Sequence, residues 1–346
     1  MNDNIPLMRK KRPQKIERGD ADNRTGAIGN EHMAIFNKTF KTINGHALFI
    51  ALKPPAVYTM SIMVTIQMPR IADYELMDSG DGYKLERYGA YIISRPDPVV
   101  IWHKKNPDIW KRADAFFHKD KRADGKHWEN KAIRNPWLFN FEQITMELRM
   151  TPFKHTGLFP EQIANWLWMK EKLAGRRDVK ILNLFGYTGG ATLFLASQGA
   201  TVTHVDASKP SITWANENQH LSDLDRAPIR WIVDDARKFV TREAKRGNVY
   251  DAIVLDPPAF GRDPRGKVFQ FEKDVPPLLE NIKKILSPTP LFVLLNSYSM
   301  GYSPVALENM FADFFPAQRI ESGELQILEK NGRVLPCSVF ARYSEV

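Results

Sequence analysis

From Thr151 to the C-terminus, short apolar runs rich in β-branched residues alternate with longer stretches of helical periodicity. This alternation is typical of a parallel sheet wrapped by helices, and it constrains the fold more than any other feature of the chain. Two last runs, 320–328 and 334–343, flank the turn Lys330-Asn331-Gly332, which predicts an antiparallel hairpin that closes the sheet. The other strands are expected at 180–185, 201–206, 230–233, 251–255 and 291–296, and helices at 160–174, 190–198, 209–221, 235–245, 275–286 and 304–314.

The sequence before this region divides into two parts. Residues 1–68 form a poorly defined basic extension. Its first 30 or so residues have no apolar periodicity, and we expect no function there, whereas residues 31–68 contain apolar patches without a clear frame and are left unassigned. Residues 69–150 contain short alternating runs broken by turns such as Ser79-Gly80-Asp81-Gly82, which predicts a small β-rich module. The chain should therefore consist of an extension, a β-rich module and an α/β domain at 151–346.

Positive charge is concentrated in the first half of the chain. The formal net charge is +9, with 25 Lys and Arg against 18 Asp and Glu in residues 1–150, but 24 against 22 in residues 151–346. A polyanion-binding appendage on a nearly neutral core would show this asymmetry, and so would a basic solvated surface without a partner. Within residues 102–137, lysines and arginines interleave with Trp and Phe. This connector either binds single-stranded nucleic acid or uses its aromatic residues as packing anchors.

Several classes of protein are disfavoured by composition. No apolar run reaches the ~20 residues needed to span a bilayer, and the basic N-terminus is not followed by an apolar signal segment, so we expect a cytoplasmic protein without a membrane partner. Cys337 is the single cysteine, which excludes an internal disulfide, and the eight histidines have no metal-ligand spacing. We therefore expect no structural metal.

The first strand of the α/β domain runs into a glycine-rich turn, Asn183-Leu184-Phe185-Gly186-Tyr187-Thr188-Gly189-Gly190, before an apolar helix. Glycines at such a turn let the backbone approach a nucleotide closely, but the spacing differs from the G-x-G-x-x-G of dinucleotide sites. The second strand ends at Asp206, where a carboxylate can accept hydrogen bonds from both ribose hydroxyls. The alternative is that Asp206 only caps the helix that follows it.

Carboxylates also end the third and fourth strands. One of Asp234 and Asp235 is expected to cap the next helix, and the pair lies where an adenine would be held. The fourth strand ends in Asp256-Pro257-Pro258, whose prolines stiffen the chain and would hold the Asp256 side chain and the Pro257 carbonyl at the edge of the sheet. Open α/β sheets bind their ligands at that edge.

With these motifs in view, the chain from about residue 74 onward resembles the class I S-adenosylmethionine-dependent methyltransferases, and within them the branch of bacterial 23S ribosomal RNA methyltransferases. The resemblance rests on the segments 155–162 (His-Thr-Gly-Leu-Phe-Pro-Glu-Gln), 183–190 and 256–260 (Asp-Pro-Pro-Ala-Phe). It implies a doubly wound, Rossmann-like α/β sheet of seven mostly parallel strands in the order 3-2-1-4-5-7-6, with strand seven antiparallel.

The resemblance also implies which residues hold S-adenosylmethionine. Residues of 155–162 line its methionine end, the glycine-rich turn passes beneath it, Asp206 holds the ribose and Asp235 approaches the adenine. The cofactor-binding residues implied are Thr156, Phe159, Gln162, Asn183, Phe185, Gly186, Tyr187, Thr188, Gly189, Asp206, Ser208, Asp235, Ala236 and Asp256.

The atom that accepts the methyl group is inferred from the absence of a cysteine after the fifth strand. Relatives that methylate carbon-5 of a pyrimidine carry a cysteine just after the fifth strand, where this chain reads Asn296-Ser297-Tyr298-Ser299, and Cys337 is expected to be a buried structural residue. Methylation of a nitrogen needs no such nucleophile. Asp256 or the Pro257 carbonyl would accept a hydrogen bond from the target amine, and Phe260 would stack on an extruded base. Because Ala259 separates Phe260 from the prolines, a ring nitrogen of guanine stays an alternative.

The leading hypothesis is therefore an RNA base methyltransferase acting on ribosomal RNA. Alternatives are a methyltransferase of proteins or small molecules, a non-catalytic RNA-binding protein, and a dehydrogenase. The basic residues Arg262, Arg265 and Lys267 after the proline loop are either phosphate contacts or plain solvated charge.

Overall fold

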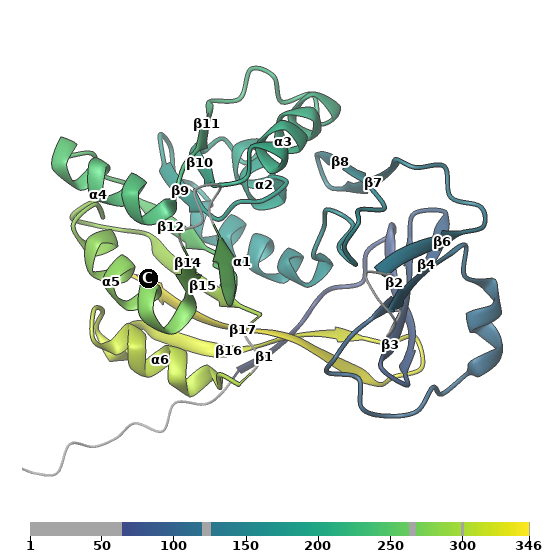
Figure 1. Cartoon of the computed structure of the whole chain (residues 1–346). Coiled ribbons are helices and arrows are strands. Elements are labelled where there is room, and N and C mark those ends of the chain that lie inside the picture. The colour runs from purple at the N-terminus through teal and green to yellow at the C-terminus, as the bar shows by residue number, and fades with distance from the viewer. Residues whose placement is uncertain (1–63, 120–125, 263–267, 299–300, 346) are drawn as a thin grey trace, which may run out of the picture. The chain divides into compact units, whose positions relative to one another are not determined.

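The largest sheet has eight strands in the order β1-β16-β17-β15-β12-β9-β10-β11 (Figure 1). The structure is a computed structural model that describes residues 64–119, 126–262, 268–298 and 301–345. All neighbouring strands are parallel except β17, which is antiparallel to both β15 and β16. The strands are β1 (Val64–Gln67), β9 (Lys180–Leu184), β10 (Thr201–Asp206), β11 (Ile229–Val233), β12 (Ala252–Leu255), β15 (Phe292–Ser297), β16 (Ile320–Leu328) and β17 (Val334–Ser344).

The order of the seven expected strands is confirmed, but the expected number is corrected by β1. This strand pairs in parallel with β16 at the edge of the sheet, and Met68, the residue after it, is buried. Gly323 of β16 makes the pairing possible, because a Cβ there would lie 2.1 Å from the carbonyl oxygen of Val64. The α/β sheet therefore begins inside the segment predicted as an extension. The remaining predictions for residues 1–63 lie outside the described residues.

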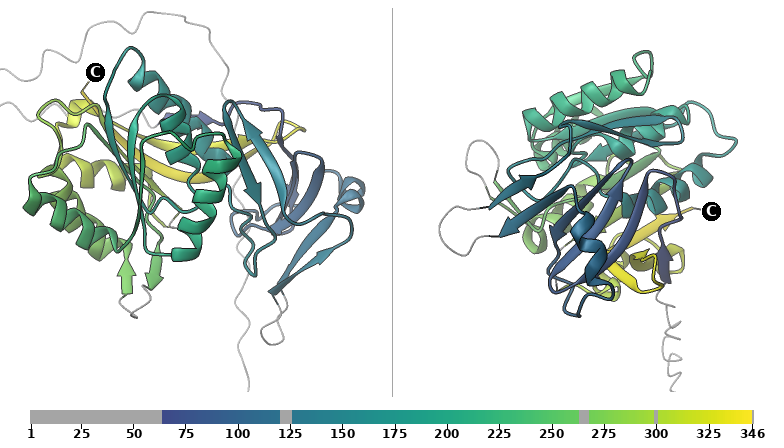
Figure 2. Two further views of the ribbon diagram at one scale, coloured as in Figure 1. Left: turned by 90° about the horizontal axis from the view of Figure 1, so that it is seen from above. Right: turned by 90° about the vertical axis from the view of Figure 1, so that its right-hand side faces the viewer.

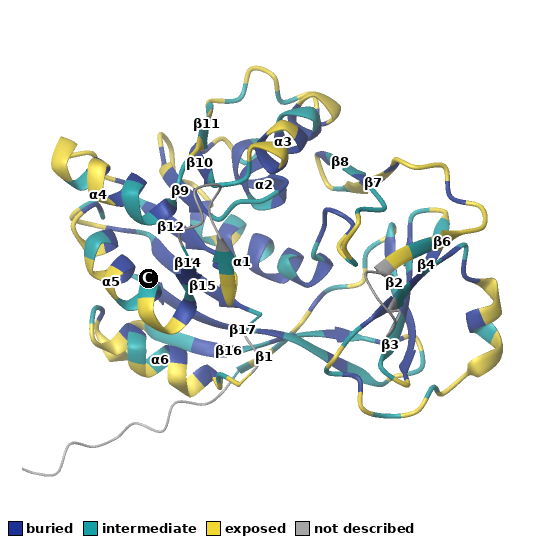
Figure 3. Cartoon of the chain, viewed as in Figure 1, coloured by how far each residue is buried: buried dark blue, intermediate teal, exposed yellow. Residues whose placement is uncertain are grey.

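Helices cover both faces of this sheet, so the doubly wound prediction is confirmed (Figures 1 and 3). The side chains of β12 show the two layers: Ala252 and Val254 pack into one core cluster, and Ile253 and Leu255 pack into the other. The first cluster includes residues of α1 and α2, and the second includes residues of α4, α5 and α6. The helices are α1 (Ile163–Leu173), α2 (Gly190–Ser197), α3 (Lys209–Leu221), α4 (Ala236–Arg246), α5 (Phe271–Lys283) and α6 (Pro304–Ala312).

Side-chain caps explain where two of these helices begin. The Ser208 hydroxyl accepts a hydrogen bond from the backbone N–H of Ser211 and caps α3, which has the predicted bounds. Asp235 caps α4 through the backbone N–H of Lys238, as expected for one of the two adjacent aspartates. The prediction for α5 was wrong by four residues at its start, because Asp274 accepts a hydrogen bond from the backbone N–H of Gln270 and stabilises an earlier first turn.

The β-rich module is a five-stranded sheet, β2-β3-β4-β5-β6, followed by a separate hairpin of β7 and β8. The predicted β-rich module is confirmed. Much of the expected connector, residues 102–137, belongs to its sheet, because β5 pairs with β4 and β6 pairs with β5. The elements are β2 (Tyr74–Gly80), β3 (Tyr83–Tyr88), β4 (Tyr91–Pro96), the 3-10 helix η1 (Pro107–Arg112), β5 (Ala115–Lys119), β6 (Lys126–Asn130), β7 (Trp137–Phe141) and β8 (Ile144–Leu148).

Several aromatic residues of this segment are packing anchors. Trp110 is buried in the cluster formed with Met77 and Leu85, and its indole N–H donates to Asp78. Phe117 is buried as well and packs edge-on against Trp128. For these residues the packing interpretation is confirmed, and their rings are not free to stack on bases.

The tip of the β16–β17 hairpin joins the large sheet to the module, and its two long strands extend toward β2 and β3 (Figures 1 and 2). The backbone N–H of Lys330 donates to the carbonyl of Leu76 at 2.9 Å, and the Arg333 guanidinium donates to the carbonyl of Ser79 at 2.8 Å. Hydrogen bonds of the hairpin tip therefore connect the module to the large sheet. Among the helices of the described ranges, none is both long and apolar enough to cross a membrane.

Candidate functional site

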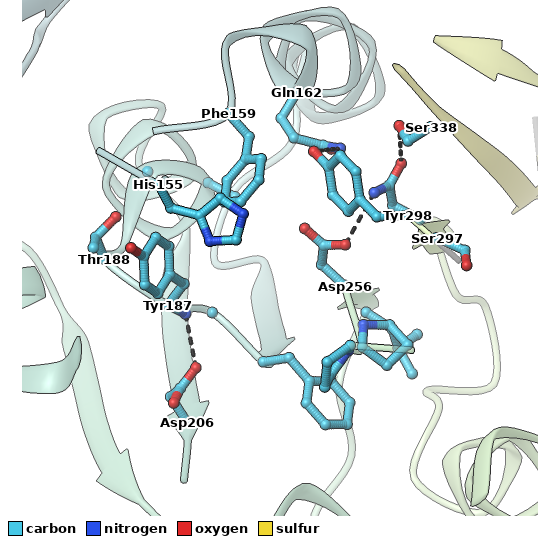
Figure 4. Close-up of a pocket in the computed structure, with 18 of the residues that line it drawn as sticks. His155, Phe159, Gln162, Tyr187, Thr188, Asp206, Asp256, Ser297, Tyr298 and Ser338 are labelled. Atoms are coloured by element: carbon cyan, nitrogen blue, oxygen red, sulfur yellow. Dashed lines mark hydrogen bonds between the residues drawn. The ribbon is translucent and has the colours of Figure 1, made fainter. Parts of the chain in front are cut away.

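A cavity of about 1180 Å³ lies at the carboxyl ends of the parallel strands (Figure 4). Binding cavities for small molecules typically enclose roughly 300–1000 Å³, so this one can take a nucleotide cofactor and part of a second ligand. The turns after β9, β10, β11, β12 and β15 supply much of its wall. The β-rich module closes another side with Lys84, Arg95 and Asp97.

The glycine-rich turn after β9 is held in an unusual backbone conformation. Phe185 and Tyr187 have positive φ angles of 61° and 53°, which side chains other than Gly rarely adopt. Gly186 stands between them, and a Cβ at that position would lie 2.3 Å from the ring of His204. Strained backbone of this kind persists where the surrounding structure holds it, and it clusters at binding sites. The turn therefore brings its backbone against the cavity as expected.

Asp206 holds this turn from the end of β10. Its carboxylate accepts hydrogen bonds from the backbone N–H of Tyr187 at 2.9 Å and from that of Ser208 at 2.8 Å. Burial raises the pKa of Asp206, and the two backbone donors oppose that rise. Each carboxylate oxygen can accept a second hydrogen bond, and the side chain lines the cavity. Asp206 therefore fits the vicinal hydroxyls of a ribose while it also fixes the turn.

The 155–162 segment forms the opposite wall and is tied to the glycine-rich turn. The Thr188 hydroxyl donates to the carbonyl of Gly157. Phe159 packs edge-on against Tyr187, with ring centroids 6.1 Å apart. His155 also lines the cavity, and burial lowers its pKa to about 4, so the imidazole is neutral near pH 7.

At the end of β11, Asp234 and Asp235 both line the cavity. The Arg237 guanidinium pairs with Asp235, and Arg242 pairs with Asp234. Although burial opposes ionisation, the hydrogen bonds from Arg237 lower the pKa of Asp235. Because Asp235 is already engaged by Arg237 and by the helix cap, its contact with an adenine stays a prediction.

Asp256 follows β12 and is fixed by its neighbour strand. Asn296 of β15 donates a hydrogen bond of 2.9 Å to its carboxylate and accepts one from Ser338 of β17. Burial raises the pKa of Asp256 to about 7, Asn296 opposes the rise, and the charge of Glu161 adds to it. Pro257 and Pro258 line the cavity beside it. This arrangement can accept a hydrogen bond from a ligand amine and can change its charge near neutral pH.

The structure brings together most of the predicted residues but leaves three outside the cavity lining. Thr156 is fully buried, and its hydroxyl has no hydrogen-bond partner in the described part of the chain. Gly189 caps α2 with a φ of 89°. Phe260 is 54% exposed in β13 (Phe260–Arg262), which pairs with β14 (Val268–Gln270). The predicted residues that do line the cavity are Phe159, Gln162, Asn183, Phe185, Gly186, Tyr187, Thr188, Asp206, Ser208, Asp235, Ala236, Asp256 and Pro257.

Other cavity residues were missed by the sequence reasoning. Glu161 lies between two predicted residues of the 155–162 segment and is 4% exposed. In the sequence, position 298 was considered only because it lacks a cysteine. A tyrosine directly after a buried parallel strand could itself have indicated a residue of the binding site. Cys337 was expected to be buried, but it is half-buried and lines the cavity. Among the basic residues that follow the proline loop, Arg265 and Lys267 lie outside the described residues.

Residues 112–312 match the family model of S-adenosylmethionine-dependent methyltransferases. The chain belongs to this family. The methyltransferase fold is also that of a crystal structure of an S-adenosylmethionine-dependent methyltransferase from Agrobacterium tumefaciens, which is 41% identical with a TM-score of 0.77 and covers 82% of this chain and 94% of its own. A putative methyltransferase from Streptococcus mutans, 17% identical with a TM-score of 0.61, covers 80% of this chain and 76% of its own and shares the fold alone.

Curated relatives of this methyltransferase are considerably longer. The ribosomal RNA large subunit methyltransferase K/L of Shewanella baltica is 35% identical over 153 residues, which cover 44% of this chain and 21% of the relative. That of Hahella chejuensis is 30% identical over 167 residues, covering 48% and 22% respectively. This chain therefore matches about a fifth of the length of these relatives.

The residues around the cavity fit S-adenosylmethionine, which supplies an electrophilic methyl group on a sulfonium when it is bound. The strained turn and the free acceptor capacity of Asp206 suit the backbone contacts and the ribose hydroxyls of an adenosine. The fit of these residues to S-adenosylmethionine says nothing about metal binding, so the expected absence of a structural metal stays a prediction.

Proposed function

We propose that this methyltransferase modifies a base nitrogen of RNA, most specifically ribosomal RNA, by direct transfer of the methyl group. The nitrogen lone pair would form the new bond to the methyl carbon, the thioether of the cofactor would leave, and the nitrogen would then release a proton to solvent. The position of Asp256 carries the proposal. Its carboxylate lines the cavity and is held by Asn296, so that it can accept a hydrogen bond from the target amine.

Such a carboxylate acts mainly by positioning. An ionised Asp256 would orient the amine and stabilise the positive charge that develops on nitrogen during transfer. Pro257 and Pro258 remove two backbone donors beside it and limit the motion of the loop. The stiffness of this proline loop favours a mechanism in which Asp256 orients the acceptor, and not one that passes through a covalent intermediate.

The properties of Cys337 argue against a cysteine adduct. Burial raises the pKa of the Cys337 thiol well above its ordinary value, and the carboxylate of Glu161 adds to the rise. Its sulfur lies 3.5 Å from the carbonyl oxygen of Leu335, as expected of a protonated thiol. A thiol is a poor nucleophile until it ionises, so covalent attack on a pyrimidine is disfavoured.

Support for an RNA substrate comes from charge and from the relatives. The basic excess lies in residues 1–150. The curated relatives in Shewanella and Hahella are named as ribosomal RNA methyltransferases. The volume of the cavity leaves room for an extruded base beside the cofactor.

Mass mapping of ribosomal RNA from a strain without the gene would test the proposal directly. We expect one methyl group to be missing and the purified protein to restore it. Binding of the same RNA should weaken steeply with salt, because phosphate contacts release counterions. Undetectable RNA binding at low salt, with S-adenosylmethionine binding intact, would instead indicate a protein or small-molecule acceptor. Absence of cofactor binding would indicate a non-catalytic protein.

A further inference from the structure

Tyr298 lines the cavity near Asp256, where the proposed reaction calls for an aromatic ring that stacks on the acceptor base. It follows β15 directly, and β15 pairs in parallel with β12, whose end carries Asp256. The Tyr298 ring lies above the Asp256 carboxylate in the close-up (Figure 4). By contrast, Phe260, the residue that the sequence suggested for stacking, is 54% exposed in β13 and does not line the cavity.

The Tyr298 ring is held on two sides. The Gln162 amide donates a hydrogen bond of 2.9 Å to its hydroxyl. Burial raises the pKa of that hydroxyl, and the nearby buried carboxylate of Glu161 adds to the rise. The ring also packs against Phe159, with centroids 5.0 Å apart and planes inclined by 44°. Asn165 donates to the Gln162 carbonyl oxygen at 2.7 Å, which fixes the amide that holds the tyrosine.

The orientation of this network has a chemical consequence. A planar ring that is fixed beside Asp256 offers a stacking face to any flat acceptor whose amine bonds to that carboxylate. Stacking is tolerant of base identity because every base has a π face. We propose that Tyr298 stacks on the acceptor base, and that Glu161 and Gln162 act as positioning residues that hold its ring. The inference rests on the proposed function, because it concerns the acceptor of that same reaction.

The test compares the wild-type protein with Tyr298 variants. The measurement is methyl transfer to large-subunit ribosomal RNA taken from a strain that lacks the gene. Loss of a stacked ring should lower kcat/KM for RNA roughly 5- to 100-fold in Tyr298→Ala. The dissociation constant of S-adenosylmethionine, measured by calorimetry, should stay close to that of the wild type. Tyr298→Phe keeps the ring and should retain most of the activity, whereas Tyr298→Leu fills the space without a planar face and should lose as much as Ala.

Two further variants separate stacking from general damage. Tyr91→Ala removes a half-buried tyrosine that packs on Trp137 in the module and does not line the cavity, so it should leave transfer unchanged. Glu161→Gln should give an intermediate loss that falls on RNA and not on the cofactor.

Several outcomes would overturn the inference. It fails if Tyr298→Leu transfers methyl groups like the wild type, or if Phe260→Ala loses more activity than Tyr298→Ala. It also fails if S-adenosylmethionine affinity falls by the same factor as kcat/KM, because Tyr298 would then be a cofactor contact. If the wild-type protein methylates no RNA, the proposed function itself is wrong and the inference falls with it.

Discussion

Asn296 donates a hydrogen bond of 2.9 Å to Asp256, and the two residues belong to the carboxyl ends of neighbouring parallel strands. Asn296 accepts a second hydrogen bond from Ser338 on the antiparallel strand β17. Three adjacent strands thus fix one carboxylate at the edge of the sheet. Because none of these contacts uses both carboxylate oxygens, Asp256 keeps acceptor capacity toward the cavity.

Asp256→Asn should lower kcat/KM for RNA roughly 10- to 100-fold, the range expected for losing a hydrogen bond to a charged group. The pKa of Asp256 is about 7 in the folded protein. Wild-type kcat/KM should therefore rise as pH increases through about 7, because only the ionised carboxylate accepts both hydrogen bonds. Measuring kcat/KM against pH checks this, and a limb that persists unchanged in Asp256→Asn would assign it to another group.

The same residue should make stability depend on pH. The folded-state pKa of Asp256, about 7, lies above its ordinary value of 3.8, so between these values the folded state binds the proton more tightly than the unfolded state. The contribution of Asp256 to the free energy of unfolding is then largest below this window and falls as pH rises through it. Urea unfolding of the wild type and Asp256→Asn across this range should show a smaller fall in the variant. Parallel curves would contradict the assignment.

Asp206→Ala should weaken S-adenosylmethionine binding about 10- to 100-fold, since two charge-assisted hydrogen bonds to ribose are lost. The structure adds a second effect, because Asp206 also fixes the backbone of Tyr187 and Ser208. A lower melting temperature should therefore accompany the weaker binding. Calorimetry and thermal unfolding measure the two effects. Asp313→Ala, an exposed aspartate at the end of α6, is the control and should change neither.

Gly186→Ala should disrupt the glycine-rich turn. The added Cβ would lie 2.3 Å from the ring of His204, which is buried and hydrogen-bonded to Thr192 at 2.8 Å, so the ring cannot move aside freely. Overpacking of this kind costs typically 1–3 kcal/mol. Denaturant unfolding should show that cost together with weaker S-adenosylmethionine binding. Gly247→Ala, at the C-terminal cap of α4 with open space around it, should cost stability alone; equal binding losses in both variants would contradict the prediction.

Cys337→Ser should retain methyl transfer, because burial raises the pKa of the thiol and the proposed transfer uses no thiol nucleophile. Because burial raises the pKa of the thiol, Cys337 should also react slowly with a thiol reagent near pH 7, although it lines the cavity. Transfer assays of the variant and the rate of thiol modification in the wild type check both statements. A folded but inactive Cys337→Ser protein would revive a covalent route.

The local patterns of the α/β domain were largely readable from the sequence. The bounds of α3 were predicted from helical periodicity after the second strand, and the structure adds the Ser208 cap that starts the helix there. The carboxylates at the ends of β10 and β12 were found because parallel strands all point their carboxyl ends to one edge. Both signals are local in the chain, so no knowledge of distant contacts was needed.

Contacts between distant segments decided the rest. Strand β1, described from Val64 to Gln67, acquires its place through pairing with β16, about 260 residues away. Trp110 is flanked by basic residues in the sequence, which left nucleic-acid stacking open as an alternative to packing, but the core of the module buries it.

By itself, the sequence determined the class of sheet, the order of its motifs and the edge at which a nucleotide cofactor binds, because periodicity, caps and strand ends are properties of neighbouring residues. Only the tertiary structure decided which aromatic ring faces Asp256. Phe260 is four residues from Asp256 in the chain but lies in a separate hairpin, whereas Tyr298, forty-two residues away, is carried to the cavity by the pairing of β12 with β15. Hydrogen bonding between strands sets that proximity, and sequence distance does not.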